Sequence, residues 1–303
     1  MKIVFMGTPD FAVPCLEALI KNGHNVTMCV TKPDMPVGRK QILTAPPVKI
    51  KALENNIKIY QPNSLKSDEA FQTIYDEQPD VIVVVAYGKI LPKNILDIPK
   101  YGCINVHASL LPKLRGASPI QWSIVTGEKE TGVTTMLMDV GLDTGDMLMS
   151  DSTPIFDNDN AETLHDRLSE LGSNLIVKTL DGLLDNSIKP QKQNEDYASY
   201  APIINKEMGR LDFNKSSREL FNLIRGFNPW PCCYFVFNNK RIKVFSSKIG
   251  GKSSSNVGAI EVIENKPFVV CGDRILLELV EICPEGSKKM TGSSAVAGRI
   301  FNN

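Results

Sequence analysis

Three polar side chains between residues 102 and 145 are of the types that amine attack on a carbonyl group requires. Asn105 and His107 stand two residues apart in the stretch Gly-Cys-Ile-Asn-Val-His-Ala-Ser, which reads as a short buried strand. Side chains two apart on a strand share a face, so we expect the amide and the imidazole to point the same way. Asp143 follows in a tight loop between Gly141 and Gly145, whose missing Cβ atoms let the backbone bend.

An amide, an imidazole and a carboxylate around one carbon have complementary roles. The amide donates a hydrogen bond to the carbonyl oxygen as it gains negative charge, and the other two groups hold or move the proton. An Asn-x-His pair alone is weak evidence, because in an arbitrary protein such residues usually satisfy loop backbone at the end of a strand. The assignment therefore depends on the surrounding sequence.

The elements that would position these residues alternate as strand, helix and strand. Residues 2–6 read as an apolar strand, the next stretch has helical spacing up to Ile20, and residues 25–31 form a second strand, which together predict a parallel sheet. Residues 80–86 are continuously apolar, as is typical of a central parallel strand. We expect Tyr87 and Gly88, which follow that strand, at the same edge of the sheet as Asn105.

The turn after the first strand argues against a nucleotide cofactor. It reads Gly7-Thr-Pro-Asp and lacks the Gly-x-Gly-x-x-Gly fingerprint, and no Walker lysine is present. We therefore expect neither a nicotinamide nor an ATP site.

The catalytic stretch resembles a known family. The run Asn-Val-His-x-Ser-Leu-Leu-Pro-x-x-Arg-Gly-Ala-x-Pro-Ile from Asn105, followed by Gly-Leu-Asp-Thr-Gly-Asp from Gly141, is similar to the 10-formyltetrahydrofolate-dependent formyltransferases. The resemblance implies an α/β fold with a Rossmann-like formyltransferase domain and a mostly parallel sheet at 1–188, a linker at 189–205 and a small OB-like β-barrel at 206–303. It also implies that the catalytic trio is Asn105, His107 and Asp143.

The resemblance further implies 10-formyltetrahydrofolate as the formyl donor, a co-substrate that carries the activated carbon, and no metal. The pterin ring is expected against residues 85–91, where backbone groups and apolar walls suit a flat heterocycle. The residues expected to contact folate are Tyr87, Gly88, Ser109, Leu110, Leu111 and Pro112.

A net charge of zero hides an asymmetry between the two halves. Residues 206–303 contain 15 basic and 9 acidic residues, a net of +6, and the remainder has a net of −6. A basic half suggests a polyanionic partner, with chance surface variation as the alternative. Together with the resemblance, this favours the branch of the family whose acceptor is the α-amino group of methionine on initiator tRNA. Residues 234–245 read as a β-hairpin with asparagines at its turn, Asn238 and Asn239, and phosphate contacts are expected from its basic residues Lys240, Arg241 and Lys243.

A second basic segment, residues 32–51, contains five basic residues and one acidic residue. Its early part is rich in Pro and Gly, which predicts a long irregular loop, and such loops in compact domains are usually functional or disordered. Arg39 and Lys40 are the candidates for holding phosphate backbone, and a solvated loop without a partner is the alternative. Trp230 is a candidate for stacking on a base or for packing at a domain interface.

Composition indicates a cytoplasmic protein. The chain has no run of about 18 apolar residues and no signal-peptide pattern at its start. Its seven cysteines are scattered without Cys-x-x-Cys spacing, which favours a reducing compartment and argues against structural zinc. The expected partners are folate and initiator methionyl-tRNA, with neither a membrane nor a protein partner.

Three alternatives remain open from the sequence. A sugar-amine formyltransferase of the same fold would be indifferent to tRNA and would not need a basic second domain. A folate hydrolase or formyl sensor would use or bind formyl-folate without an acceptor. An RNA-binding protein without catalysis would have no need for an intact Asn105, His107 and Asp143.

Overall fold

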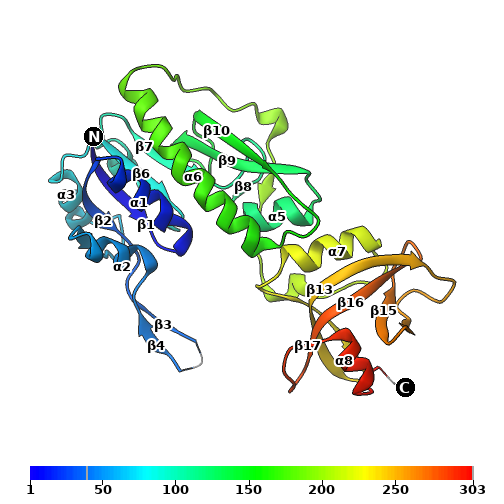
Figure 1. Ribbon diagram of the computed structural model, residues 1–303. Coiled ribbons are helices and arrows are strands. Elements are labelled where there is room, and N and C mark those ends of the chain that lie inside the picture. Colours follow the sequence, from blue (N-terminus) through cyan, green and yellow to red (C-terminus); the bar gives the residue numbers. More distant parts are fainter. Residues whose placement is uncertain (39, 302–303) are drawn as a thin grey trace. The chain divides into compact units, whose positions relative to one another are not determined.

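The computed structural model describes residues 1–38 and 40–301, which divide into two compact units (Figure 1). The first unit consists of residues 1–116, 131–153 and 165–200. The second unit consists of residues 117–130, 154–164 and 201–303. Each unit therefore combines segments that are far apart in the sequence.

The first unit is built on a seven-stranded sheet in the order β10-β9-β7-β6-β1-β2-β5. The five strands from β7 to β5 are parallel, and β9 runs antiparallel to β7. The predicted α/β fold with a mostly parallel sheet is therefore confirmed. The strands are β1 (Lys2–Gly7), β2 (Asn25–Val30), β5 (Lys58–Tyr60), β6 (Val81–Val85), β7 (Cys103–His107), β9 (Glu130–Leu137) and β10 (Met147–Pro154).

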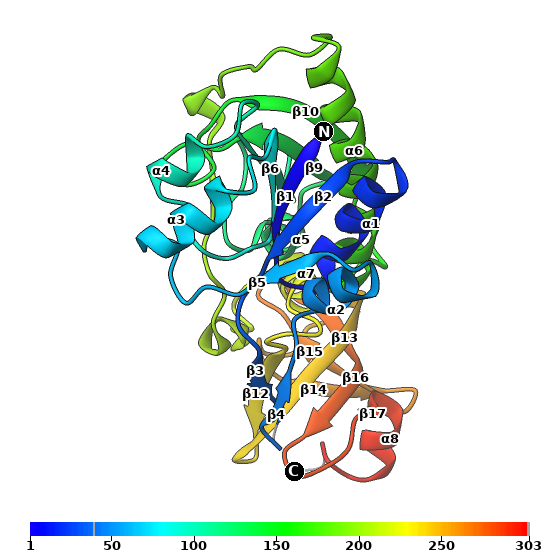
Figure 2. The same ribbon diagram turned by 90° about the vertical axis from the view of Figure 1, so that its left-hand side faces the viewer.

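Helices cover both faces of this sheet (Figure 2). On one face Met6 packs with Ile74 of α3 and Ile95 of α4 in a buried cluster. On the other face α6 approaches so closely that a Cβ atom on Gly172 would lie 3.0 Å from Val106 Cγ1. No helix in the described residues is long and apolar enough to cross a membrane. The helices are η1 (Asp10–Ala12), α1 (Val13–Lys21), α2 (Pro47–Glu54), α3 (Asp68–Tyr75), α4 (Lys93–Leu96), η2 (Glu195–Tyr197) and α6 (Ala161–Leu184), of which α6 belongs to this unit from residue 165 on.

The carboxyl ends of the central strands meet at one edge of the sheet. The register pairs Val84 of β6 with Asn105 of β7. Beyond the strand ends, Thr8 Oγ1 donates a hydrogen bond to the carbonyl oxygen of Tyr87 at 3.2 Å. The structure thus places the start of the catalytic stretch beside the end of the apolar central strand.

The segment that we predicted to be an irregular loop contains a β-hairpin, drawn in blue in Figure 1. β3 (Met35–Val37) pairs with β4 (Ile42–Thr44), with Met35 opposite Thr44. The prediction was wrong here because each strand of a two-stranded hairpin pairs on one side only. Pro36, which has no backbone N–H to donate, is tolerated where that group would face the unpaired side.

The second unit is built on an antiparallel sheet in the order β12-β13-β16-β15-β14, with β17 against β16. The predicted asparagine turn joins β12 to β13, where Asn238 and Asn239 have φ values of 47° and 60°, the left-handed pair of a tight hairpin. Register shifts in β13 next to Ser246 bend the sheet around its core. The elements are β12 (Cys233–Phe237), β13 (Lys240–Lys252), β14 (Ile260–Ile263), β15 (Lys266–Val270), β16 (Ile275–Pro284), β17 (Met290–Thr291), α5 (Pro119–Val125), η3 (Lys206–Gly209) and α8 (Gly292–Ala297).

Helix α7 (Ser217–Gly226) packs on the core of the second unit. It starts with a capping box in which Ser216 accepts from the backbone of Glu219 and the Glu219 side chain accepts from the backbone of Ser216. Leu220 and Ile224, four residues apart on one face, are fully buried in the core cluster. Two short strands, β8 (Arg115–Gly116) and β11 (Tyr200–Ala201), lie outside both large sheets.

Candidate active site

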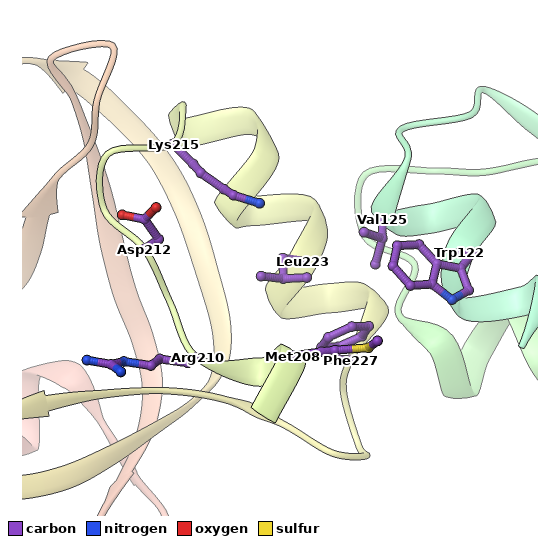
Figure 3. Close-up of a pocket in the computed structure, with 8 residues that line it drawn as sticks. All are labelled: Trp122, Val125, Met208, Arg210, Asp212, Lys215, Leu223 and Phe227. Atoms are coloured by element: carbon purple, nitrogen blue, oxygen red, sulfur yellow. The ribbon is translucent and has the colours of Figure 1, made fainter. Parts of the chain in front are cut away.

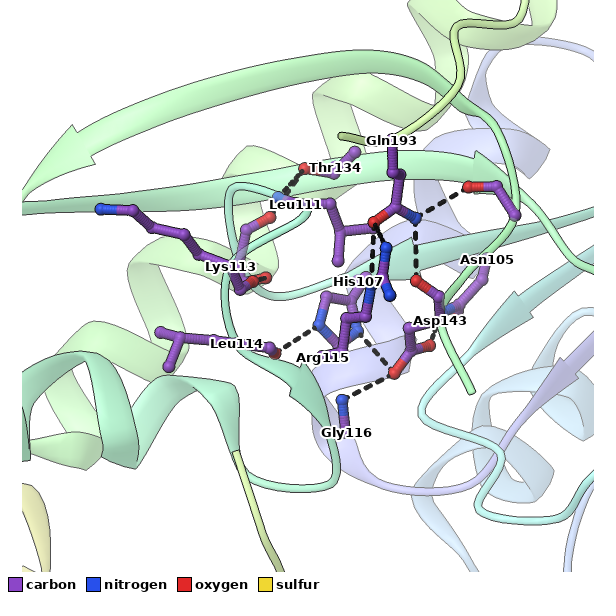
Figure 4. Close-up of polar contacts among 12 residues, drawn as sticks. Asn105, His107, Leu111, Lys113, Leu114, Arg115, Gly116, Thr134, Asp143 and Gln193 are labelled. Atoms are coloured by element: carbon purple, nitrogen blue, oxygen red, sulfur yellow. Dashed lines mark hydrogen bonds and ion pairs between the residues drawn. The ribbon is translucent and has the colours of Figure 1, made fainter. Parts of the chain in front are cut away.

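The three residues that the sequence singled out converge at the carboxyl edge of the first sheet (Figure 4). Asp143 Oδ2 lies 3.7 Å from His107 Nδ1, and Asn105 Nδ2 donates to Asp143 Oδ1 at 3.4 Å. The side chains of His107 and Asp143 are 6% and 14% exposed. A strand end and a distant loop thus bring an amide, an imidazole and a carboxylate into one small volume that is largely shielded from water.

The His107 ring is oriented by a backbone carbonyl. Its Nε2 lies 3.0 Å from the carbonyl oxygen of Leu114, which can only accept, so the hydrogen is on Nε2. Nδ1 is then the nitrogen that faces Asp143. The 3.7 Å between Nδ1 and Asp143 Oδ2 is longer than a hydrogen bond, so the carboxylate acts on the ring here through its charge.

The Asp143 carboxylate is held by the loop that follows β7. The backbone N–H of Gly116 donates to Asp143 Oδ2 at 2.8 Å. Asp143 itself has a φ of 54°, in the left-handed region that few residues other than glycine adopt. The bend that we expected at the neighbouring glycines therefore lies at Asp143. Gly145 is needed for a different reason, because a Cβ atom there would collide with the carbonyl oxygen of Leu137.

A side chain that the sequence did not single out holds the same loop. Gln193 Nε2 donates to the carbonyl oxygens of Asp143 and Gly145, both at 2.8 Å. Gln193 lies in the polar segment that we interpreted as an interdomain linker, 189–205. No periodicity or motif in that segment signals these contacts, because they depend on where the chain returns in space.

Arg115, fully buried, connects Gln193 to Glu195 of the same segment. Its Nε and Nη2 donate to Gln193 Oε1 at 3.0 and 2.8 Å. It also pairs in a bidentate manner with Glu195, at 2.9 and 2.7 Å. The hydrogen bond from Arg115 lowers the pKa of the Glu195 carboxyl, and the same bond raises the pKa of Arg115, so the pair is ionised near neutral pH.

The expected folate residues differ in exposure. Two hydrogen bonds hold the segment after β7 in place. Ser109 Oγ donates to the carbonyl oxygen of Lys113 at 2.6 Å, and the N–H of Leu111 donates to Thr134 Oγ1 of β9 at 3.1 Å. Buried residues can shape a ligand wall from behind, and exposed ones can touch the ligand. Ser109, Leu111 and Tyr87 are buried, whereas Leu110, Pro112 and Gly88 expose surface.

The backbone after β6 is shaped for close approach. Gly88 has a φ of 74°, a backbone conformation that favours glycine, and a Cβ atom there would lie 2.6 Å from Nζ of the flexible Lys32 side chain. The Tyr87 side chain is turned into the apolar cluster on one face of the sheet, where burial raises the pKa of its hydroxyl to about 12. The backbone of Tyr87, rather than its ring, therefore lies at this edge of the sheet.

Four of the five basic residues expected to bind tRNA are described by the structure, and they lie on two hairpins. Arg39 lies outside the described residues, and Lys40 is exposed in the turn between β3 and β4. On the hairpin of the second unit, Arg241 lies with its guanidinium carbon 4.2 Å from the centroid of the Tyr234 ring. Lys240 and Lys243 are exposed on the same strand, and Trp230 is 52% exposed.

The second unit has a pocket of its own, with a volume of ≈ 230 Å³ (Figure 3). Its apolar wall includes Trp122, Leu223 and Phe227, and Arg210 and Lys215 add positive charge. Asp212 adds a carboxylate to the lining, and none of the residues that line this pocket belongs to the predicted trio. Within residues 1–38 and 40–301, no group of three His, Cys, Asp or Glu side chains could hold a metal ion.

Comparison with known families matches both halves of the chain. Residues 1–180 match the family described as formyl transferase, and residues 203–299 match the formyl transferase C-terminal domain. The methionyl-tRNA formyltransferase of Clostridium perfringens (strain SM101 / Type A) is 49% identical over 303 residues, which cover 99% of this chain and 98% of that protein. The methionyl-tRNA formyltransferase of Bacillus subtilis (strain 168) is 46% identical over 98% of this chain and 94% of its own length.

Solved structures show the same fold at lower identity. An N-formyltransferase from Helicobacter canadensis, in complex with folinic acid and dTDP-3-aminofucose, is similar with a TM-score of 0.72 and 23% identity. The match covers 96% of this chain and 100% of that one. HypX from Aquifex aeolicus in complex with tetrahydrofolic acid is similar with a TM-score of 0.67 and 14% identity, over 100% of this chain and 48% of that one.

Proposed function

Because this chain belongs to the formyl transferase family, we propose that it transfers a formyl group from 10-formyltetrahydrofolate to the α-amino group of methionyl initiator tRNA. The product is N-formylmethionyl-tRNA for translation initiation. The observation that carries this proposal is identity of 46–49%, over almost the whole length of both chains, to methionyl-tRNA formyltransferases. We propose the cytoplasm, where translation uses the product, as its compartment.

The roles of the trio follow from their donors and acceptors. Bound folate supplies an activated formyl carbon, to which the methionine nitrogen forms a bond while the bond from that carbon to N10 breaks. Asn105 Nδ2 and a hydrogen on His107 Nδ1 would stabilise the negative charge that develops on the formyl oxygen. Because Leu114 keeps the first proton on Nε2, donation from Nδ1 requires the doubly protonated ring. Asp143 would take the proton that the attacking amine loses, directly or through a water molecule, and N10 gains one in turn.

We propose that the N-terminal and C-terminal parts of the chain bind different substrates. Residues 1–188 would bind folate, with its ring against the backbone of residues 85–91 and the exposed surfaces of Leu110 and Pro112. Residues 206–303, joined by the segment 189–205, would bind tRNA. Arg39 and Lys40 would add phosphate contacts from the first unit.

Replacing Arg241 and Lys243 together by alanine is expected to raise the KM for charged tRNA and leave kcat at saturation unchanged. Both side chains are exposed on the face of β13 that points away from the core residues Ile242 and Val244. Their loss removes two charges and, for Arg241, the contact with the Tyr234 ring. For each phosphate that the tRNA no longer pairs with a basic side chain, the slope of log KM against log salt should fall by about 1. A Lys21→Ala variant, on the exposed end of α1, is the control. An unchanged salt slope in the double variant would assign tRNA binding to another surface.

The function itself is tested by incubating charged initiator tRNA with the protein and resolving the product on an acid-urea gel. A mobility shift is expected only when 10-formyltetrahydrofolate is present. A dTDP-linked amino sugar serves as the competing acceptor, since sugar N-formyltransferases share the fold. Formylation of the sugar with no change in the tRNA would refute the proposal in favour of a sugar-amine enzyme.

A further inference from the structure

Residues 191–199, which we call the strap, contact the loop that carries Asp143 and the segment that follows β7, and Figure 4 shows Gln193 of the strap beside Asp143. At one end, the backbone of Gln191 exchanges two hydrogen bonds with that of Met147, both at 2.8 Å. At the other end, Ser199 Oγ accepts from the N–H of Leu114 at 2.9 Å. Gln193 lies between these anchors. The strap is therefore fixed to the chain on both sides of the site.

We propose that Gln193 is a positioning residue for the reaction: it fixes the loop that carries Asp143 relative to His107. The inference rests on the proposed formyl transfer, and it goes beyond the trio because Gln193 touches neither reacting group with its side chain. Its two hydrogen bonds to the loop are to the backbone carbonyls of Asp143, where the loop bends, and of Gly145, two residues further on.

The direction of the Gln193 amide follows from its partners. Its Oε1 accepts two hydrogen bonds from Arg115, a group with donors only, so the oxygen must face the guanidinium. The amide nitrogen then faces the carbonyl oxygens of Asp143 and Gly145, which can only accept. Arg115 is in turn held by Glu195, so the orientation of Gln193 is determined on every side.

The Asp143 loop is supported both from within and by the strap. Inside the loop, Asp139 Oδ1 accepts from the N–H of Gly141 at 2.9 Å and from Thr144 Oγ1 at 2.8 Å. A left-handed φ in a residue other than glycine is unfavourable and persists where the surroundings hold it. Two neighbouring apolar side chains in the loop, Val140 and Leu142, are 74% and 59% exposed, so they contribute little burial to its stability. The Gly116 N–H fixes the carboxylate, and Gln193 fixes the backbone that carries it.

The strap also supports the histidine side of the site. Ser199 accepts from Leu114, whose carbonyl oxygen orients His107, and the Ser199 carbonyl accepts from the N–H of Arg115 at 2.8 Å. The strap thus contacts both Leu114, which orients the His107 ring, and the loop that carries Asp143. The distance between Nδ1 of His107 and Oδ2 of Asp143 is set by elements that the strap joins.

Two variants separate the possible roles of Gln193. Gln193→Ala removes every hydrogen bond of the side chain, whereas Gln193→Glu keeps an oxygen for Arg115 and has no donor for the two carbonyls. We expect both variants to lower kcat about 100-fold, the usual cost of misplacing a catalytic group by about 1 Å, with the KM for 10-formyltetrahydrofolate within about twofold of the parent. The matched control is Gln191→Ala, because Gln191 joins the strap through its backbone and its side chain is exposed.

A retained kcat in Gln193→Glu with a reduced kcat in Gln193→Ala would overturn the proposal, because the hydrogen bonds with Arg115 would then suffice. An equal reduction in Gln191→Ala, or one matched by a fall in Tm, would overturn it too. Hydrogen exchange measures the order of the loop in the protein alone, without the acceptor substrate. The backbone amides of residues 139–146 should exchange about tenfold faster in both Gln193 variants, as expected when two hydrogen bonds are removed. If the parent transfers no formyl group, the proposed function fails, and unchanged exchange would separately refute the positioning role.

Discussion

His107→Ala is expected to lower kcat by roughly 100- to 1,000-fold, the typical effect of removing one donor to a developing oxyanion. The side chain is 6% exposed, and its Nε2 is anchored by the carbonyl oxygen of Leu114. The position of the imidazole is thus fixed before the substrates bind. Single-turnover formylation of charged tRNA measures this effect apart from product release.

The control for His107 is His165→Ala. His165 lies on α6, beside Asp10 and with its ring against Phe11, and we do not place it in the site. Its loss should leave formylation unchanged. Full activity in His107→Ala, with the control also active, would end the assignment of His107 to catalysis.

Asp143→Asn is expected to lower kcat by about 100-fold or more, because an amide cannot accept the proton of the attacking amine. Asparagine suits this test, since it tolerates the left-handed φ of 54° and its oxygen can still accept from the N–H of Gly116. The loop should therefore keep its shape while the chemistry is lost. The measurement is kcat with saturating folate and tRNA, together with Tm to verify the fold.

An exposed carboxylate provides the matched control for Asp143. Asp68→Asn, in the first turn of α3, makes the same chemical change away from the site and should retain activity. If Asp143→Asn formylated tRNA at the parent rate, the amine proton would have to leave by a route that does not involve this carboxylate.

Local patterns predicted the elements of the fold well. The leucines of α6 recur at helical spacing over residues 161–184, which are the bounds of the helix in the structure. The asparagine pair of the second hairpin predicted its turn, because these residues adopt the left-handed conformations there. In each case a property of neighbouring residues, period or turn chemistry, determines the local structure without reference to the rest of the chain.

The relation of Asn105 to His107 is likewise local, because two residues apart on a strand means one shared face. Their relation to Asp143 is not, since a loop 38 residues from Asn105 can lie anywhere that the intervening hairpin directs it. The motif resemblance suggested that the carboxylate returns to this point, and the sheet order β10-β9-β7 provides the path.

What the sequence by itself determined was the alternation of strands and helices, the shared face of the amide and the imidazole, and the family. Only the tertiary structure decided that the polar segment after α6 is part of the site. Gln193 lies 50 residues from Asp143 and 78 from Arg115, so no local period or propensity relates them. Their hydrogen bonds form because the fold places residues 191–199 next to the Asp143 loop and Arg115. Local sequence patterns do not encode this proximity.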